Sequence, residues 1–275
     1  MSIPKPVVLC ILDGWGLSDD TAANAPALAN TPNFDRIMRD GPSAQLITHG
    51  PDAGLPSGQM GNSEVGHTNI GAGRVVAMDL GQIDLAVENG SYFEAEALVE
   101  FIGKMKASGG TAHVMGLLSD GGVHGMLTHM IASFDVIAKA GVPVALHLIT
   151  DGRDVAPSSA HGYLEKLESA LPAGVKIATV CGRYYALDRD NRWERVSTAF
   201  HAMVNAQGAA QPNAKSTIDA AYANDITDEF IEATVIGGYM GARDGDGLFC
   251  LNFRADRARE ILAALADPVF DAFTT

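Results

Sequence analysis

The sequence predicts an α/β protein in which mainly parallel sheets are flanked by helices. Three observations lead to this fold class. Apolar residues make up 47% of the 275 residues, which is enough material for the cores of two domains. Short continuous apolar runs alternate with segments of helical period. Four of these runs are similar in character, and parallel pairing is the simplest sheet for strands that alternate with helices.

The composition argues against several classes of function. A formal net charge of -14 disfavours nucleic acid as a partner and repels anionic substrates at long range, so a site for a phosphorylated acid must concentrate positive charge locally. No apolar run approaches the roughly 20 residues that cross a bilayer, and the first residues lack the apolar block of a secretory signal. We therefore expect a cytoplasmic protein with no membrane partner. Cys10, Cys181 and Cys250 lie in apolar runs without a C-x-x-C pair, which predicts buried thiols.

The first part of the chain begins with an apolar run at residues 7–12, which predicts a strand buried on both faces. Asp13 follows at the carboxyl edge of this strand, a position that also suits an aspartate capping the next turn. Residues 31–41 predict a helix with Thr31 at its N-cap, one apolar face and a glycine at its end. A second strand is expected at residues 44–48. The order of elements is that of the start of an α/β domain.

A glycine-rich loop then places one hydroxyl, that of Ser63, just ahead of a helix expected from Glu64 to Ile70 and capped by Asn62 or by Ser63 itself. Free amides at that helix start would face an anion on the serine oxygen. The simpler interpretation is an N-cap serine in a turn. A phosphate-binding loop is disfavoured because His67 stands where lysine is needed, and Val65 breaks the glycine pattern of a nucleophile elbow.

The pattern of elements restarts after residues 75–81, which predicts a first domain at 1–78 and a second at 79–275. In the second domain we expect strands at residues 112–118, 142–149, 175–180 and 248–253, with helices at about 94–107, 127–140 and 163–171. Each strand runs into a polar loop. In a parallel sheet these four loops emerge at the same edge, where ligands bind in open α/β folds.

The four loops would bring an arginine-rich set of side chains into one cleft of a strongly acidic protein. The set is His124, Asp151, Arg153, Asp154, Arg183, Arg189, Arg254 and Arg257. Arginine grips carboxylate and phosphate groups through two parallel hydrogen bonds, so the expected ligand is a small acidic molecule. Arg192, Arg195 and Arg259 lie among acidic neighbours on helix-like stretches and are interpreted as solvated ion-pair residues.

Within this set, Asp154 could act as general acid and base toward a substrate hydroxyl if a neighbouring carboxylate or partial burial tuned its pKa. Asp151 is interpreted as a cap of its loop. His124, between Gly122 and Gly125, could donate a hydrogen bond to a transferred phosphoryl group. No two histidines show the H-E-x-x-H spacing of a zinc protease.

Several separate segments of the sequence, in the same order, resemble the family of cofactor-independent (2,3-bisphosphoglycerate-independent) phosphoglycerate mutases. They are residues 60–74 around Ser63, the Gly-Gly-Val-His run at 121–124, Asp-Gly-Arg-Asp at 151–154, residues 182–189 and residues 252–257. The resemblance implies that 1–78 is part of an alkaline phosphatase-like metal domain and that 79–275 is an α/β phosphoglycerate-binding (transferase) domain. It further implies an isomerase of glycolysis and gluconeogenesis that interconverts 3-phosphoglycerate and 2-phosphoglycerate.

The resemblance also implies roles for single residues. Ser63 would form a phosphoserine intermediate beside two Mn²⁺ ions, with Mg²⁺ as the alternative metal, and both Asp13 and Ser63 would be metal ligands. Asp154 would manage the hydroxyl protons. The substrate contacts would be His124, Arg153, Asp154, Arg183, Arg189, Arg254 and Arg257. No 2,3-bisphosphoglycerate cofactor and a monomeric protein are implied.

In the family the polypeptide continues well beyond the length of this sequence, and that later part carries the remaining metal ligands and a substrate-contacting lysine. We therefore expect an N-terminal portion that is inactive by itself. A phosphoglycerate-binding module without turnover is the second hypothesis. A third is another metal-dependent phosphomutase or phosphatase, for which the arginine set is the discriminator because a sugar phosphate has no carboxylate.

Overall fold

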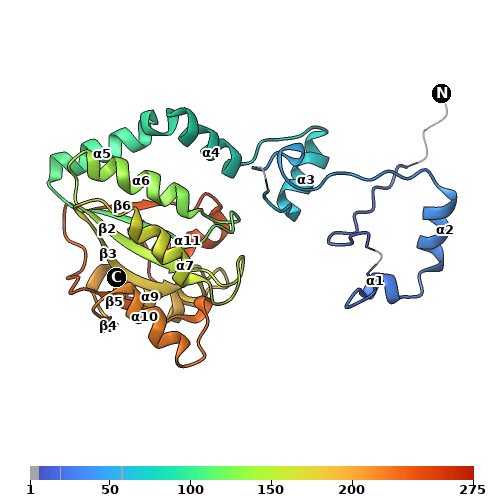
Figure 1. Cartoon of the computed structure of the whole chain (residues 1–275). Coiled ribbons are helices and arrows are strands. Elements are labelled where there is room, and N and C mark those ends of the chain that lie inside the picture. Colours follow the sequence, from blue (N-terminus) through green and yellow to red (C-terminus); the bar gives the residue numbers. More distant parts are fainter. Residues whose placement is uncertain (1–5, 19, 57) are drawn as a thin grey trace. The chain divides into compact units, whose positions relative to one another are not determined.

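The computed structural model describes residues 6–18, 20–56 and 58–275, and the chain divides into two compact units, 1–78 and 79–275 (Figure 1). The second unit contains a six-stranded sheet in the order β4-β5-β3-β2-β1-β6. The strands are β1 Ala112–Leu117, β2 Val144–Thr150, β3 Val175–Gly182, β4 Ala209–Gln211, β5 Thr234–Ile236 and β6 Gly247–Cys250. The predicted α/β fold class is therefore confirmed.

The four strands expected from the sequence are β1, β2, β3 and β6, and all of them pair in parallel, as predicted. The two further strands are only three residues long. β4 pairs in parallel with β5, whereas β5 runs antiparallel to β3. The sheet is thus mixed at one end and parallel through its centre, so the carboxyl ends of four strands meet at one edge.

Helices pack on both faces of this sheet and form two hydrophobic cores (Figure 1). Leu146 and Leu148 of β2 point into one core, which is filled by Phe134 of a covering helix, while Ile149 points into the other, as the two-residue period of a strand requires. The helices of the unit are α4 Asp79–Asn89, α5 Glu96–Ser108, α6 Leu127–Lys139, α7 Ala160–Ser169, α8 Arg183–Ala186, α9 Trp193–Asn205, α10 Ala214–Tyr222 and α11 Ala255–Ala266, with 3₁₀ turns η2 Ser91–Glu94 and η3 Asp228–Phe230. In the part of the chain that the structure describes, no helix is long and apolar enough to cross a membrane.

The first unit contains α1 Ala25–Leu28, α2 Pro32–Asp40, η1 Pro51–Ala53 and α3 Ser63–Ala72. The helix predicted for residues 31–41 is confirmed as α2, with Thr31 as N-cap, proline at the first helical position and Gly41 as C-cap. The buried core of this unit is small and consists of Ala53, Leu55 and Val65. The apolar face of α2 stays exposed, with Ile37 59% accessible.

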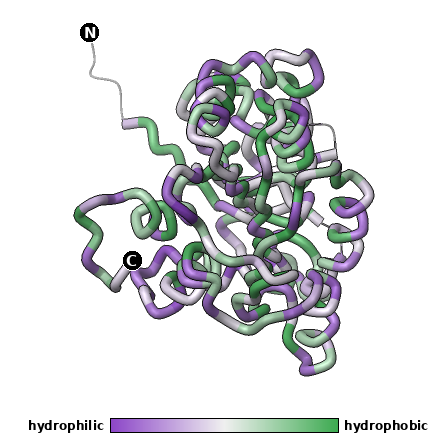
Figure 2. Tube along the Cα trace, turned by 90° about the vertical axis from the view of Figure 1, so that its left-hand side faces the viewer, coloured by the Kyte–Doolittle hydropathy of each residue, from purple (hydrophilic) through white to green (hydrophobic). Residues whose placement is uncertain are grey.

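The strands predicted at residues 7–12 and 44–48 are not formed, and both runs are exposed coil. Figure 2 shows in green the hydrophobic residues of the first run, which follow the grey trace at the N-terminus. Val7 is 95% and Leu46 84% accessible. A strand needs a neighbour to pair its backbone N–H and C=O groups, and the described residues of the first unit contain no strand. For the same reason Cys10 is exposed, so the prediction of a buried thiol is wrong there, whereas Cys181 is buried and Cys250 half-buried.

Candidate functional site

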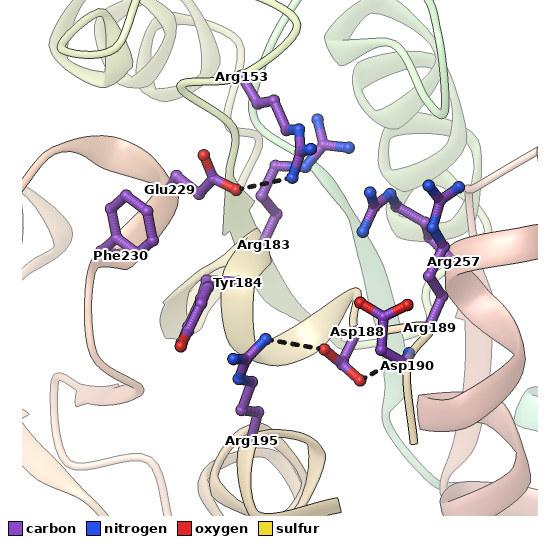
Figure 3. A pocket seen from close by; sticks show the side chains of 10 residues that line it. All are labelled: Arg153, Arg183, Tyr184, Asp188, Arg189, Asp190, Arg195, Glu229, Phe230 and Arg257. Carbon is purple, nitrogen blue, oxygen red and sulfur yellow. Dashed lines mark hydrogen bonds and ion pairs between the residues drawn. The ribbon is translucent and has the colours of Figure 1, made fainter. Parts of the chain in front are cut away.

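A cavity of about 450 Å³ lies at the carboxyl edge of the parallel strands, and five arginines line it (Figure 3). Arg153 comes from the loop after β2, Arg183 is the first residue of α8 directly after β3, and Arg257 lies on α11 after β6. The full lining is Arg153, Arg183, Tyr184, Asp188, Arg189, Asp190, Arg195, Glu229, Phe230 and Arg257. The structure thus brings four of the arginines expected from the sequence into one cavity wall.

Arg183 is buried and bridges two carboxylates of the loop after β2. Its Nη1 donates to Asp151 Oδ1 and to Asp154 Oδ2, each at 2.6 Å. Asp151 also accepts from the Ser119 hydroxyl at 2.6 Å and from the backbone N–H groups of Arg153 and Asp154. Burial alone would raise the pKa of Asp151, but the Ser119 hydroxyl and the Arg183 guanidinium hold it below its usual value. Asp151 therefore caps its loop, as expected, and also neutralises Arg183.

The remaining guanidinium groups of the cavity repel one another. Burial lowers the pKa of Arg257, and the nearby charges of Arg183, Arg189 and Arg153 lower it further. Arg257 stays charged at neutral pH because arginine titrates far above it, and three neighbouring arginines act on its guanidinium against the single opposing charge of Asp256. An anion bound in the cavity would relieve that repulsion. A positive cavity in a chain of net charge -14 is the local concentration of charge that an acidic ligand requires.

His124 lies beside this wall, in contact range of two carboxylates. Its Nε2 is 3.7 Å from Asp154 Oδ2 and its Nδ1 is 3.6 Å from Asp256 Oδ1. Burial lowers the pKa of His124 to about 4, and the positive charge of Arg183 acts in the same direction. At neutral pH His124 is therefore uncharged and carries one N–H that can be donated to a ligand oxygen.

Asp256 also belongs to the site, although the sequence did not predict it as a site residue. Its carboxylate pairs with Arg189 at 2.9 Å and with Arg254 Nε at 3.3 Å. Several buried side-chain atoms here have no hydrogen-bond partner among the described residues: His124 Nδ1, both amide atoms of Asn252, and Asp256 Oδ1, which has the ion pair with Arg254 but no hydrogen bond. Buried polar atoms are nearly always paired in native proteins, so this cluster fits a place that a polar ligand completes. The signal for Asp256 was its position between two arginines of the segment at 252–257.

Arg195 lies in the cavity wall, so its interpretation as a solvated ion-pair residue is wrong. Its side chain is 17% accessible, pairs with the buried Asp188 at 3.1 Å and lies over the ring of Tyr184, 3.8 Å from the centroid. Glu260 packs beside Asp188, and burial together with the Asp188 charge raises the pKa of Glu260. The pattern of charges on α9 is typical of an exposed helix face, and it gives no sign of the aromatic partner Tyr184, the second residue of α8.

Ser63 lies in the first unit as the first residue of α3. Its Oγ donates to Asp13 Oδ2 at 2.7 Å. Asn62 is the N-cap, because its Oδ1 accepts from the Val65 N–H at 3.1 Å, so the Ser63 hydroxyl is not used as the cap. His67 Nδ1 is 3.2 Å from Ser63 Oγ and 2.8 Å from the Ser63 carbonyl oxygen. A carbonyl oxygen only accepts, so Nδ1 carries the proton and cannot take one from Ser63.

The metal ligands expected in the first unit can be compared with this geometry. The adjacent oxygens of Asp13 and Ser63 suit a hard divalent cation such as Mn²⁺ or Mg²⁺. Such ions take about six ligands, and within residues 6–18, 20–56 and 58–275 no group of three or more histidine, cysteine, aspartate or glutamate side chains could hold a metal ion. The described residues therefore fit part of a ligand shell and not a complete one.

Known proteins resemble the chain over most of its length. The family profile described as "BPG-independent PGAM N-terminus" matches residues 83–275. A protein of Ruegeria pomeroyi named "2,3-bisphosphoglycerate-independent phosphoglycerate mutase" is 68% identical over 275 residues, which is all of this chain and 54% of that protein. A protein of the same name from Dinoroseobacter shibae is 67% identical over 273 residues and is also 54% covered. The chain spans about half the length of the curated relatives it matches.

A solved structure gives the same result at lower identity. The crystal structure of Leishmania mexicana phosphoglycerate mutase at low cobalt concentration superimposes with a TM-score of 0.81 at 32% sequence identity. The match covers 90% of this chain and 48% of that one.

Proposed function

Because the chain belongs to the family of BPG-independent phosphoglycerate mutases, we propose that it supplies the phosphoglycerate-binding cavity and the phosphoryl-accepting serine for the interconversion of 3-phosphoglycerate and 2-phosphoglycerate. In this proposal the second unit is the phosphoglycerate-binding (transferase) domain and the first is part of an alkaline phosphatase-like metal domain. The reaction belongs to glycolysis and gluconeogenesis, needs no 2,3-bisphosphoglycerate, and is carried out in the cytoplasm by a monomer.

The observation that carries the proposal is the arginine-lined cavity. Phosphoglycerate has a phosphate at one end and a carboxylate at the other, and each can be bound by the two parallel N–H groups of a guanidinium. Arg153 and Arg189 are about half exposed and hold single carboxylates, Glu229 at 3.3 Å and Asp256 at 2.9 Å. Both can exchange such a partner for a ligand oxygen at little cost, because exposed ion pairs are worth about 0–1 kcal/mol.

The other expected substrate residues receive distinct roles. Arg257 and Arg254 add positive charge from α11 and the loop before it, and His124 offers one N–H to the phosphoryl group. Arg183 is held by two carboxylates, so we assign it mainly to fixing Asp154 beside the cavity. Asp154 would give a proton to the substrate oxygen that leaves phosphorus and later take one from the attacking hydroxyl.

Ser63 is the proposed phosphoryl acceptor. A bond forms between Ser63 Oγ and phosphorus while the bond from phosphorus to the 3-oxygen of the substrate breaks; the Ser63 proton passes to Asp13, and the 3-oxygen takes the proton of Asp154. The return step breaks the serine bond and forms the bond to the 2-oxygen; the 2-hydroxyl proton passes to Asp154, and the serine oxygen takes its proton back from Asp13. Asp13 accepts the hydrogen bond of the Ser63 hydroxyl and so orients its oxygen.

Asp13 and Ser63 are the residues that would hold divalent metal here, and Mn²⁺ is the preferred ion with Mg²⁺ as the alternative. When bound, two such ions would lower the pKa of the serine hydroxyl and neutralise phosphoryl charge. The described part of the chain provides two ligand oxygens and no complete set, which favours a second candidate function, binding of phosphoglycerate without turnover.

Phosphorus NMR of 3-phosphoglycerate mixed with the chain and Mg²⁺ separates these functions. We expect the 3-phosphoglycerate signal to shift and broaden with the wild-type chain and not with Arg189→Ala. Arg39→Ala is the matched control, because Arg39 forms only an exposed pair with Asp40 on α2. A growing 2-phosphoglycerate signal would show turnover, and its absence with a shifted substrate signal would show a binding module. The proposal fails if the substrate signal does not respond, or if ribose 5-phosphate binds in preference.

A further inference from the structure

A second group of titratable side chains lies at the opposite, amino edge of the sheet, and it forms a buried hydrogen-bonded chain. Asp246 Oδ2 is 3.1 Å from His113 Nε2, and His113 Nδ1 is 2.9 Å from His147 Nε2. His147 Nδ1 is in turn 2.9 Å from Thr179 Oγ1. This hydrogen-bonded group runs from the second residue of β1, His113, to the middle of β2 and β3, where His147 and Thr179 lie. None of these residues belongs to the arginine cavity.

The direction of each hydrogen bond follows from the end groups. The Asp246 carboxylate only accepts, so His113 Nε2 carries the proton between them. Burial lowers the pKa of His147 to about 3, and the His113 charge adds to this, so His147 carries a single N–H. When His147 Nε2–H donates to His113 Nδ1, its Nδ1 is free to accept from the Thr179 hydroxyl. Every side-chain nitrogen of the two histidines is then hydrogen-bonded, so Asp246, His113, His147 and Thr179 form one connected wall.

This wall borders a cavity of about 380 Å³. His113 and Asp246 line it together with Tyr239, whose hydroxyl donates to the Met203 carbonyl at 2.6 Å. The rest of the wall is mostly apolar and includes Ile177 and Ile236. The cavity therefore offers a hydrophobic floor beside a fixed polar side.

The backbone around the cavity departs from regular structure in two places. Strand β3 carries a bulge at Ala178, which lies between the residues paired with Leu146 and His147 and lines the cavity. Gly237 and Gly238 of the loop after β5 both have positive φ, of 57° and 75°, a conformation that glycine adopts at little cost. Bulges and positive-φ glycines are common where backbone approaches a ligand.

The charges of the cavity leave it positive. Asp246 is its only lining carboxylate, and its two oxygens already accept from the Thr111 N–H at 2.7 Å, the Arg243 N–H at 2.8 Å and His113. Lys176 and Arg243 also line the cavity, and neither forms an ion pair within the part of the chain that the structure describes. Two uncompensated cations in a chain of net charge -14 would attract an anion.

We propose that this cavity is a second ligand site, which binds a small organic acid with its anionic group between Lys176 and Arg243 and its carbon skeleton over Ile177 and Met240, which also lines the cavity. The site is separate from the proposed phosphoglycerate site, because the two lie at opposite ends of the same strands. The anionic group is a carboxylate or a phosphate, since both are bound by the same cationic side chains. The apolar floor requires a hydrocarbon or aromatic body.

The test uses the full 275-residue chain and three probes: benzoate, phenyl phosphate and inorganic phosphate. Histidine ring signals in nitrogen–proton NMR correlation spectra report on the site directly, because His113 lines the cavity and His147 is hydrogen-bonded to His113. We expect benzoate or phenyl phosphate to shift the signals of both rings while the exposed ring of His67 stays unchanged. Binding of 3-phosphoglycerate measured in parallel shows whether the arginine cavity is affected, so the two proposals can fail separately.

Variants decide whether the assigned residues bind the probe. Lys176→Ala combined with Arg243→Ala should weaken probe binding on the order of tenfold, because it removes both exposed cations that would face the anionic group. Lys176→Glu should weaken it further. Lys104→Ala combined with Arg39→Ala removes the same charge from exposed positions elsewhere and should have no effect. Unchanged binding in the first variant, no shift of the His113 and His147 signals with any probe, or equal affinity for inorganic and phenyl phosphate would each overturn the proposal.

Discussion

Similar apolar runs are buried as strands in the second unit of the chain and exposed as coil in the first. In the second unit, runs such as β2 are buried on both faces, and every residue of Val144–Thr150 is inaccessible to solvent or nearly so. In the first unit, the runs at 7–12 and 44–48 are exposed coil, although their sequences predict strands as well. A buried parallel strand is thus decided by its neighbours and not by its own sequence. The two units also differ in their polar groups, since the second unit gathers five arginines around one cavity while the first unit brings together two oxygens, those of Asp13 and Ser63.

Hydrogen exchange should show the largest difference between the units. Backbone amides of β2 are paired on both sides and open only with the unit, so we expect them to exchange at least about 10⁴-fold more slowly than the amides of residues 7–12. Exchange rates read by mass spectrometry or NMR provide the measurement. Strong protection at residues 7–12 would mean that this run has a strand partner and that the contrast is wrong.

Matched truncations of apolar side chains sharpen the same contrast. Phe134→Ala empties the centre of a core where the ring is fully buried, and should cost about 3–5 kcal/mol of unfolding free energy. Leu46→Ala removes a side chain that is 84% exposed and should change stability by less than about 0.5 kcal/mol. Urea unfolding followed by circular dichroism measures both. Comparable losses would show that Leu46 is buried in solution.

Ion pairs should also contribute more to stability in the buried second unit than on the exposed surface of the first. Arg183→Ala leaves Asp151 and Asp154 without their shared cation in a buried setting, and should cost about 3–5 kcal/mol. Arg39→Ala breaks an exposed pair on α2 and should cost about 0–1 kcal/mol. The same unfolding experiment compares the two. A small loss in Arg183→Ala would indicate that water reaches Asp151, against its nearly complete burial.

Acid should weaken the second unit gradually as the pH falls. Burial lowers the pKa of His124 to about 4 and of His147 to about 3, while unfolded histidine titrates near 6.5. Below pH 6.5 both histidines are protonated in the unfolded state and still neutral in the folded state. The free energy of unfolding therefore falls as the pH drops from about 6.5 to 4. The loss is at most about 1.4 kcal/mol per pH unit for each ring. Thermal melts at pH 7, 6 and 5 measure this slope, and His147→Gln should reduce it. A flat profile would contradict the burial of both rings as neutral groups.

The sequence predicted the centre of the second unit well, because four apolar runs buried on both faces leave a strong local signal. It missed β4 and β5, which are three residues each and too short to show a period. It placed Arg153, Arg183, Arg189 and Arg257 in loops that follow strands, and the structure gathers them around one cavity, although Arg183 and Arg257 lie in the first turns of α8 and α11. The roles of single residues were harder to predict, since they depend on contacts between segments far apart in the chain.

Two residues illustrate this limit. Asp256 pairs with Arg189, 67 positions away, and the only local signal for it is its position between Arg254 and Arg257, which does not reveal the distant partner. Arg195 was interpreted as solvated because it lies among charged neighbours, yet it packs on Tyr184 in the cavity wall. The errors at residues 7–12 and 44–48 have the same origin, because pairing partners of a strand are not encoded in the strand itself.

The claim that one arginine-lined cavity recognises both ends of phosphoglycerate is tested most directly by calorimetry with two ligands on the wild-type chain. 3-Phosphoglycerate and glycerol 3-phosphate share the phosphate, and only the first has a carboxylate. We predict that 3-phosphoglycerate binds at least about tenfold more tightly, since a charged hydrogen-bonded pair is worth about 1.5–3 kcal/mol. Equal affinities, or no heat with either ligand, would contradict a cavity built for a phosphorylated acid.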